Sequence, residues 1–337
     1  MQALPILLYC TEVDCDHSCQ ICGFKTEIGR FYINDIAALI KYVFECRNSA
    51  TLLDIESEKD SKNFHFRGVK SIKDGRVYKL LNANKGKYNV NIFLVSDGVR
   101  IRKGSTKELW LALFTIAEVP KHLQRSFLSV VGVVWYDEKK TDMKTFLKPF
   151  VETMQNLDQD QGVGIEWTHP TTKEVNKSFV RLLVTVLDAP ARAVVQNVLQ
   201  FNGRFGCNIC EIKLQMSKPV PSQPDLKAMR VYYYVASPKV RTQNRMLKQA
   251  EKVLAEGKPM KGVKGRSVLC LIPSVDISQC IVPEYLHSVL LGVGKQQLNI
   301  WLLNKGMFSL ANKVPEIDDF LRKFKHPKFV HRKQRQF

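Results

Sequence analysis

Strand-like runs and helical patterns follow one another in a definite order between residues 88 and 199. Alternating or continuous apolar residues predict four strands, over 88–96, 109–119, 126–136 and 179–187. Helical spacing predicts a helix over 140–155, with a kink or early end at Pro149, and another from Asp188 to about Leu199. The strand over 179–187 is apolar almost throughout, as expected for a strand buried on both faces. This order predicts an α/β fold, a mixed sheet flanked by helices.

Two aspartates stand where strand-like runs end. Asp97 follows the first run and Asp188 follows the fourth. Because Mg²⁺ or Mn²⁺ is usually held by one or two carboxylates, waters and phosphate oxygens, the pair predicts a metal site for phosphodiester chemistry. Each aspartate also has a structural interpretation. Asp97-Gly98 is a common hairpin turn, and Asp188 before Ala-Pro is a good helix N-cap.

Cysteine and histidine spacing predicts zinc. Cys207-x-x-Cys210 lets two thiolates reach one ion, and Glu284-x-x-His287 on one helix face offers His287 as a third ligand and Glu284 as a candidate fourth. Two buried cysteines and a core histidine are the alternative. An N-terminal set has the spacing of a zinc knuckle, or is the remnant of a damaged domain: Cys10, Cys15, Cys19 and Cys22.

Positive charge is concentrated in two segments of a chain whose formal net charge is +19. Residues 212–270 hold thirteen Lys or Arg against three Asp or Glu, and residues 322–337 hold seven and no acid. Such clusters favour DNA as a partner, because neutralised phosphates release condensed counterions; a solvated basic face is the alternative. The residues predicted to contact DNA are Arg241, Arg245, Lys248, Lys261, Lys264 and Arg266.

No membrane partner is expected. The longest apolar stretches, such as 127–136, fall short of the ~20 residues that span a bilayer. Residues 1–10 lack the basic leader and the small-residue cleavage site of a signal peptide.

Several strings resemble, in order, those of CACTA-type (EnSpm-like) DNA transposases of the DDE/D class, from about Cys19 onward. The strings span 97–99, 146–150, 188–191, 200–210, 262–265 and 284–293. The resemblance implies a ribonuclease-H-like mixed sheet with a zinc-stabilised, mainly helical insertion, two metal ions, and nicking and transfer of DNA strands in the nucleus. It makes Asp97 and Asp188 the first two catalytic acids and matches Cys207, Cys210 and His287 to the family's cysteines and histidine. Glu284 stands where the family usually has aspartate.

The family's third acid follows a basic, proline-containing stretch that residues 312–337 resemble, and this chain has no counterpart of that acid. We therefore expect a truncated or domesticated copy with little strand-transfer activity, or a non-catalytic DNA-binding or interaction protein. The oligomeric state is left open by the sequence, and a homo-oligomer is one of the alternatives. The predicted divisions are 1–30 (cysteine-rich), 31–84 (helical and loop lead-in), 85–206 (catalytic core), 207–310 (insertion) and 311–337 (basic segment).

Overall fold

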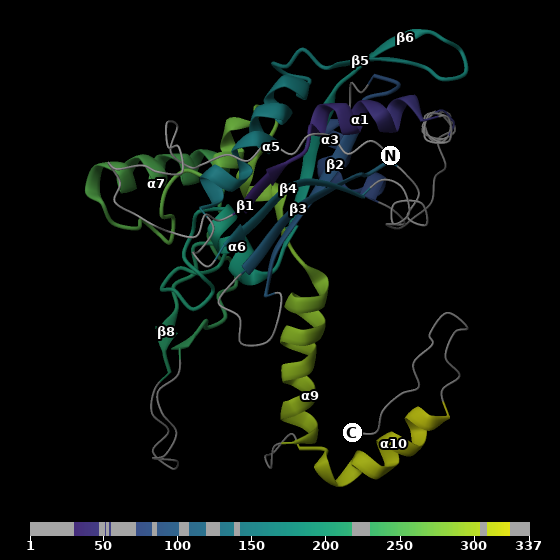
Figure 1. The fold of residues 1–337 in the computed structure, drawn as a ribbon. Coiled ribbons are helices and arrows are strands. Elements are labelled where there is room, and N and C mark those ends of the chain that lie inside the picture. The colour runs from purple at the N-terminus through teal and green to yellow at the C-terminus, as the bar shows by residue number, and fades with distance from the viewer. Residues whose placement is uncertain are drawn as a thin grey trace. The chain divides into compact units, whose positions relative to one another are not determined.

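The computed structural model describes residues 30–46, 51, 54, 72–82, 86–100, 108–118, 129–137, 142–217, 230–303 and 309–323. Contacts divide the chain into two units, Met1–Pro283 and Glu284–Phe337, and each is described by itself. The first unit contains a sheet with helices packed on it (Figure 1).

One six-stranded mixed sheet organises the first unit. Its strands lie in the order β1-β4-β3-β2-β7-β10. The pairs β1–β4, β4–β3 and β3–β2 are antiparallel, whereas β2–β7 and β7–β10 are parallel. The bounds are β1 Arg30–Ile33, β2 Val90–Arg100, β3 Glu108–Ile116, β4 Ser129–Asp137, β7 Val180–Leu187 and β10 Ile281–Pro283. The mixed α/β class predicted from the sequence is confirmed.

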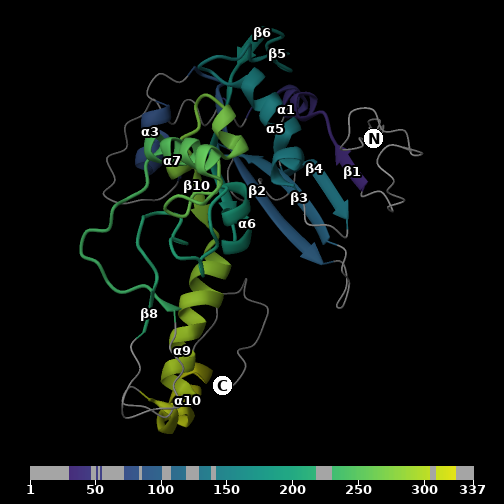
Figure 2. The same cartoon turned by 90° about the vertical axis from the view of Figure 1, so that its left-hand side faces the viewer.

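Helices cover both faces of the sheet (Figure 2). Helices α1 (Ile36–Glu45) and α5 (Met143–Leu157) bury Ile40, Phe44, Phe146 and Phe150 in one core with strand residues such as Ile92. On the opposite face a second, smaller cluster joins α3 (Arg76–Leu81), preceded by a short 3₁₀ turn (Ile72–Asp74), to Phe93 and Leu183. Successive strand residues thus serve opposite faces, as the period of a strand requires.

Two element ends differ from the sequence prediction. Helix α5 continues for eight residues beyond Pro149, and Asp142 caps its start. The predicted early end is therefore wrong, because the tertiary packing of Phe150, Val151, Met154 and Leu157 outweighs the loss of one helical hydrogen bond. Helix α6 spans only Ala189–Val195 and ends four residues before Leu199. Asn197, which adopts φ +56°, then turns the chain away.

The region after α6 carries mostly short elements. The longest element there is the basic helix α7 (Gln243–Glu256), which is ended by Gly257 in the left-handed conformation. The other elements from 201 to 283 are β8 (Gln215–Met216), β9 (Arg230–Val231), a 3₁₀ turn η2 (Val268–Leu271), α8 (Ile277–Cys280) and β10. Since β10 pairs with β7, the segment predicted as one insertion over 207–310 returns to the sheet before residue 284. The β5–β6 hairpin (Ile165–Thr168 and Val175–Ser178) was not predicted.

The second unit is helical where it is described. A π-helix η3 (Leu286–Gly294) runs directly into α9 (Lys295–Leu302), and a 3₁₀ turn η4 (Ala311–Lys313) precedes α10 (Val314–Arg322). Across the described part of both units, no helix combines the length and apolar character needed to span a bilayer.

Candidate functional site

Asp97 and Asp188 stand at equivalent positions on neighbouring parallel strands. The pairing of β2 with β7 runs to Val95 opposite Val186, and each aspartate lies two residues further along its strand direction. Asp188 has an extended backbone, with φ −68° and ψ 173°, and directly follows β7 as the N-cap of α6. Neighbouring strands lie about 4.8 Å apart. We call Asp97, Gly98 and Asp188 the acid edge.

The structure tests the structural interpretation of each aspartate, a hairpin turn at Asp97 and a helix N-cap at Asp188. Strand β2 continues through Asp97-Gly98 to Arg100, so the hairpin turn is wrong. The exposed Asp97 accepts from the Gly98 amide at 2.8 Å. The N-cap at Asp188 is confirmed, because its Oδ1 accepts from the Ala191 amide at 2.8 Å. One oxygen of a carboxylate can cap a helix while the other faces a ligand, so capping and metal binding are compatible at Asp188.

Gly98 allows an indole to lie against the acid edge. It pairs with Trp110 across β2 and β3, and a Cβ atom at Gly98 would overlap the Trp110 ring. Trp110 also makes an edge-on contact with Phe146, with 6.4 Å between ring centroids. The glycine beside Asp97 is therefore required by packing, a role that sequence reasoning missed.

Arg192 connects the acid edge to the cysteine pair. It lies one helical turn after Asp188, and its amide donates to the Asp188 carbonyl at 2.9 Å. Burial lowers the pKa of the guanidinium, while the nearby Asp188 and Cys207 act in the opposite direction. Within the described residues its buried Nε has no hydrogen-bond partner. Sequence reasoning missed this residue, although its i+4 spacing from Asp188 is visible.

The acid edge suits a hard divalent cation in part. Mg²⁺ typically takes one or two carboxylates and completes its octahedron with waters and phosphate oxygens. Two carboxylates on adjacent strands supply that minimum. In the part of the chain that the structure describes, no three His, Cys, Asp or Glu side chains come close enough to hold a metal ion together.

Cys207 and Cys210 lie together in a turn-rich segment, residues 203–211, that we call the cysteine loop. Their Sγ atoms are 3.4 Å apart, and the Cys210 amide points at the Cys207 sulfur at 3.4 Å. Two thiolates on one tetrahedral zinc ion lie about 3.8 Å apart, since each Zn–S bond is about 2.3 Å. Burial raises the pKa of the Cys210 thiol, an effect opposed by the Ile212 amide and Arg241 and reinforced by Cys207. The two sulfurs lie slightly closer together than in such a site, and zinc binding by the pair stays a prediction.

Arg241 holds the cysteine loop from inside. It is 2% exposed, and its guanidinium donates to the carbonyls of Cys207 at 2.9 Å, Phe205 at 3.1 Å and Lys261 at 2.9 Å. Burial lowers its pKa, while Glu211 and the two cysteines act against that shift. A side chain in this position joins loops and does not present its charge to DNA. The prediction that Arg241 contacts DNA is corrected accordingly.

Glu284 and His287 contact each other at the start of the second unit. The Glu284 carboxylate accepts from the His287 amide at 2.6 Å and lies 2.8 Å from His287 Nδ1. Those bonds, the amide bond foremost, lower the pKa of Glu284. Glu284 precedes the helix and accepts from the amides at its start, so the two side chains contact each other without sharing a helix face as predicted. Their contribution to a zinc site with the cysteine loop stays a prediction, and Cys10, Cys15, Cys19 and Cys22 lie outside the described residues.

The remaining predicted DNA contacts differ in exposure. Lys248, Lys261, Lys264 and Arg266 are exposed. Arg245 is half-buried, donating to the Val240 carbonyl at 2.6 Å and lying 3.9 Å from Glu211.

Gly262 (φ +86°) could not carry a Cβ atom, which would overlap the Phe205 carbonyl. The Gly-Val-Lys-Gly string is therefore explained by a tight turn against the cysteine loop.

No protein-family model matches this chain, and a search of curated proteins finds no match either. The function must therefore be inferred from the geometry of the site.

Proposed function

We propose that this chain is a DNA-processing protein derived from a DDE/D transposase, with a ribonuclease-H-like core that acts on phosphodiester bonds. The observation that carries the proposal is that Asp97 and Asp188 each lie two residues beyond Val95 and Val186, the last paired residues of the parallel strands β2 and β7. Two acids at one sheet edge, on strands distant in sequence, are what a metal-dependent phosphoryl-transfer site needs. A nuclear location is part of the same proposal.

The strand order supports the ribonuclease-H-like part of the proposal. Three antiparallel strands, β2, β3 and β4, are followed by β7 and β10, both parallel to the first. This order is similar to the one that the resemblance leads us to expect, a ribonuclease-H-like sheet with acids on the first strand and at the end of the fourth, with β1 added at its edge. Asp97 and Asp188 occupy those two places.

Each residue of the site has a separate role in this proposal. Asp97 and Asp188 would hold Mg²⁺ or Mn²⁺, which supplies an activated water or 3′-hydroxyl and stabilises the leaving oxygen. Arg192, one turn after Asp188, places a positive charge near that carboxylate. The Trp110 indole packs on Gly98 and fixes the strand that carries Asp97. The cysteine pair provides half of a structural zinc site near the same helix.

A second candidate is a non-catalytic DNA-binding protein. It is favoured by the absence, within the described residues, of a third ligand group at the acid edge. A site with two of three acids holds its metal ions weakly, so the expected turnover is low even if the fold is retained. The exposed cations Lys248, Lys261 and Lys264 suffice for salt-dependent DNA binding.

The test is DNA binding and Mn²⁺-dependent nicking by the purified 337-residue protein. We expect binding that weakens steeply with salt, and slow nicking that both Asp97→Ala and Asp188→Ala abolish without changing DNA affinity. The matched control is Asp160→Ala, an exposed acid paired with Arg181 away from the acid edge. Binding without any nicking supports the second candidate, and failure to bind DNA at either low or moderate salt contradicts both.

A further inference from the structure

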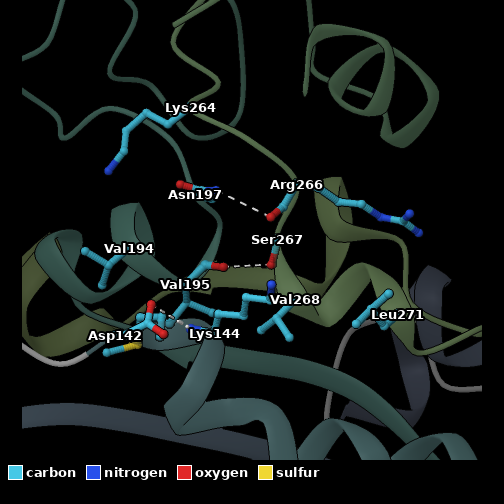
Figure 3. A pocket seen from close by; sticks show the side chains of 11 residues that line it. Asp142, Lys144, Val194, Val195, Asn197, Lys264, Arg266, Ser267, Val268 and Leu271 are labelled. Carbon is cyan, nitrogen blue, oxygen red and sulfur yellow. Dashed lines mark hydrogen bonds between the residues drawn. The ribbon is translucent and has the colours of Figure 1, made fainter. Parts of the chain in front are cut away.

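A hollow of about 630 Å³ lies beyond the carboxyl end of α6 (Figure 3). Three segments distant in sequence line it: the start of α5, the end of α6 and the segment through η2. The lining residues are Asp142, Met143, Lys144, Val194, Val195, Asn197, Lys264, Arg266, Ser267, Val268 and Leu271. This volume lies within the range of small-ligand sites, roughly 300–1,000 Å³.

The rim of the hollow is cationic. Lys144, Lys264 and Arg266 are all exposed, and Figure 3 shows Lys264 and Arg266 on opposite sides of Asn197. The only acid among the lining residues is Asp142, whose carboxylate accepts from the amides of Lys144 at 3.4 Å and Thr145 at 3.0 Å. Burial raises the pKa of Asp142, but the hydrogen bonds from Thr145 and Lys144 and the charge of Lys144 lower it overall, so this one carboxylate caps α5 and faces three cations in the lining.

The walls are apolar. Val194, Val268 and Leu271 line the hollow, and Leu271 is 44% exposed. A simple phosphate ion would gain nothing from these side chains. A ligand that joins an anionic group to a flat apolar one would use both the rim and the walls.

The hollow is held in shape before any ligand arrives. Ser267 Oγ donates to the Val195 carbonyl at 2.7 Å, and the Lys264 amide donates to the Asn197 carbonyl at 2.9 Å. A Cβ atom at Gly265 would come within 2.7 Å of the Asn197 side chain, so the loop packs directly on the end of α6. Such preorganisation lowers the cost of binding.

We propose that this hollow binds one nucleotide of a single DNA strand, its phosphate against Lys144 and Lys264 and its base against Val194, Val268 and Leu271. The inference rests on the proposed function, because it takes DNA as the ligand. Asp188 begins α6 and the hollow lies at its other end. Seven helical residues rise about 10 Å, a span of one or two nucleotides, so one strand can reach both places.

The experiment is fluorescence anisotropy with a labelled single strand, its duplex and deoxythymidine monophosphate. We expect Lys144→Gln combined with Lys264→Gln to weaken single-strand binding about tenfold and to flatten the salt slope by about 0.7, the value for one phosphate of a single strand. Leu271→Asn should weaken it about threefold to tenfold without changing the slope.

Two matched controls lie outside the hollow. Lys148→Gln changes an exposed lysine one turn along α5, and Leu254→Asn changes a 90% exposed leucine on α7. Both should bind as the unaltered protein does. Thermal melting checks that each variant is folded.

Three results would overturn the inference. Hollow variants that bind the single strand like their controls would show that the site is unused. Equal losses for single strand and duplex would assign the lysines to ordinary surface phosphate contacts, and binding of the mononucleotide as tight as that of the strand would assign the hollow to a free nucleotide. In each case DNA binding by the unaltered protein leaves the proposed function standing, whereas no binding to either DNA form defeats both.

Discussion

The acid edge and the cysteine loop are positioned by different physical means. At the acid edge, the pairing of β2 with β7 sets where Asp97 and Asp188 lie, and nine paired positions along β2 and β3 support the strand from the other side. The cysteine loop has an isolated bridge, from Cys210 to Val240, and depends on the buried Arg241. Many backbone hydrogen bonds along two strands position the first region, whereas a few scattered bonds and the Arg241 side chain position the second.

The difference predicts how each region responds to change. A register shared by many hydrogen bonds tolerates the loss of one of them, because the others still specify the pairing. A loop held by three bonds to one guanidinium loses all three at once. The cysteine loop should therefore be the more fragile region, even though its motif is the more specific one in the sequence.

Among the variants considered, Arg241→Ala is expected to lower the unfolding free energy most. It removes the donor of three part-buried hydrogen bonds and leaves a cavity where the buried guanidinium lay, which costs roughly 2–4 kcal/mol of unfolding free energy. Arg241→Lys keeps the charge but not the planar fork, and should lose most of the same stability. Urea unfolding measures both.

The control for that prediction is Arg245→Ala, since Arg245 lies four residues further along the chain, in the first turn of α7, and is half-buried. Removing the Arg245 side chain should lower the unfolding free energy by only about 0.5–1 kcal/mol. Equal effects at 241 and 245 would mean that the cysteine loop does not depend on the buried guanidinium.

Gly98→Ala should have the next largest effect. The added methyl group overlaps the Trp110 indole and forces a shift in the two paired strands, at a cost of about 1–3 kcal/mol. In a chain that already carries Trp110→Leu the indole is gone, so adding Gly98→Ala there should cost less unfolding free energy than it does in the original protein. A Gly98→Ala protein as stable as the original would show that the acid edge is not packed as described.

The smallest effect on the apoprotein is expected for Cys207→Ser. Without metal the substitution keeps the shape of a half-buried side chain and should change the unfolding free energy by less than about 1 kcal/mol. Bound zinc, measured by elemental analysis, should fall from about one ion per chain to near zero. Zinc retained by the variant, or absent from the original protein, would remove the cysteine pair from a metal site.

Sequence patterns predicted the elements around the acid edge because burial on a sheet leaves a period in the sequence. The apolar run over 179–187 became β7, and the alternation over 88–96 became the first part of β2. The end of β2 was mispredicted, because Asp-Gly has the composition of a turn and only the cross-strand partner Trp110 shows why glycine lies within a strand. The short strands β5, β6 and β10 have too few residues to show a period.

The site was predicted less completely than the fold. Residue type and spacing indicated Asp97, Asp188 and the cysteine pair, because their chemistry is local to a motif. Arg241 was assigned to the surface, since a basic residue at the start of a basic helix looks the same in sequence whether it faces solvent or is buried. Lys144 was missed, because only the tertiary fold brings the start of α5 to the segment at 264–271.

The most direct test of the central claim is a crystal structure of the protein soaked in Mn²⁺, with anomalous diffraction used to locate the ion. The account predicts a manganese peak in contact with both the Asp97 and Asp188 carboxylates, and its loss in Asp97→Asn crystals. A well-ordered structure in which the two carboxylates are too far apart to share a cation, or in which manganese binds only elsewhere, would contradict it.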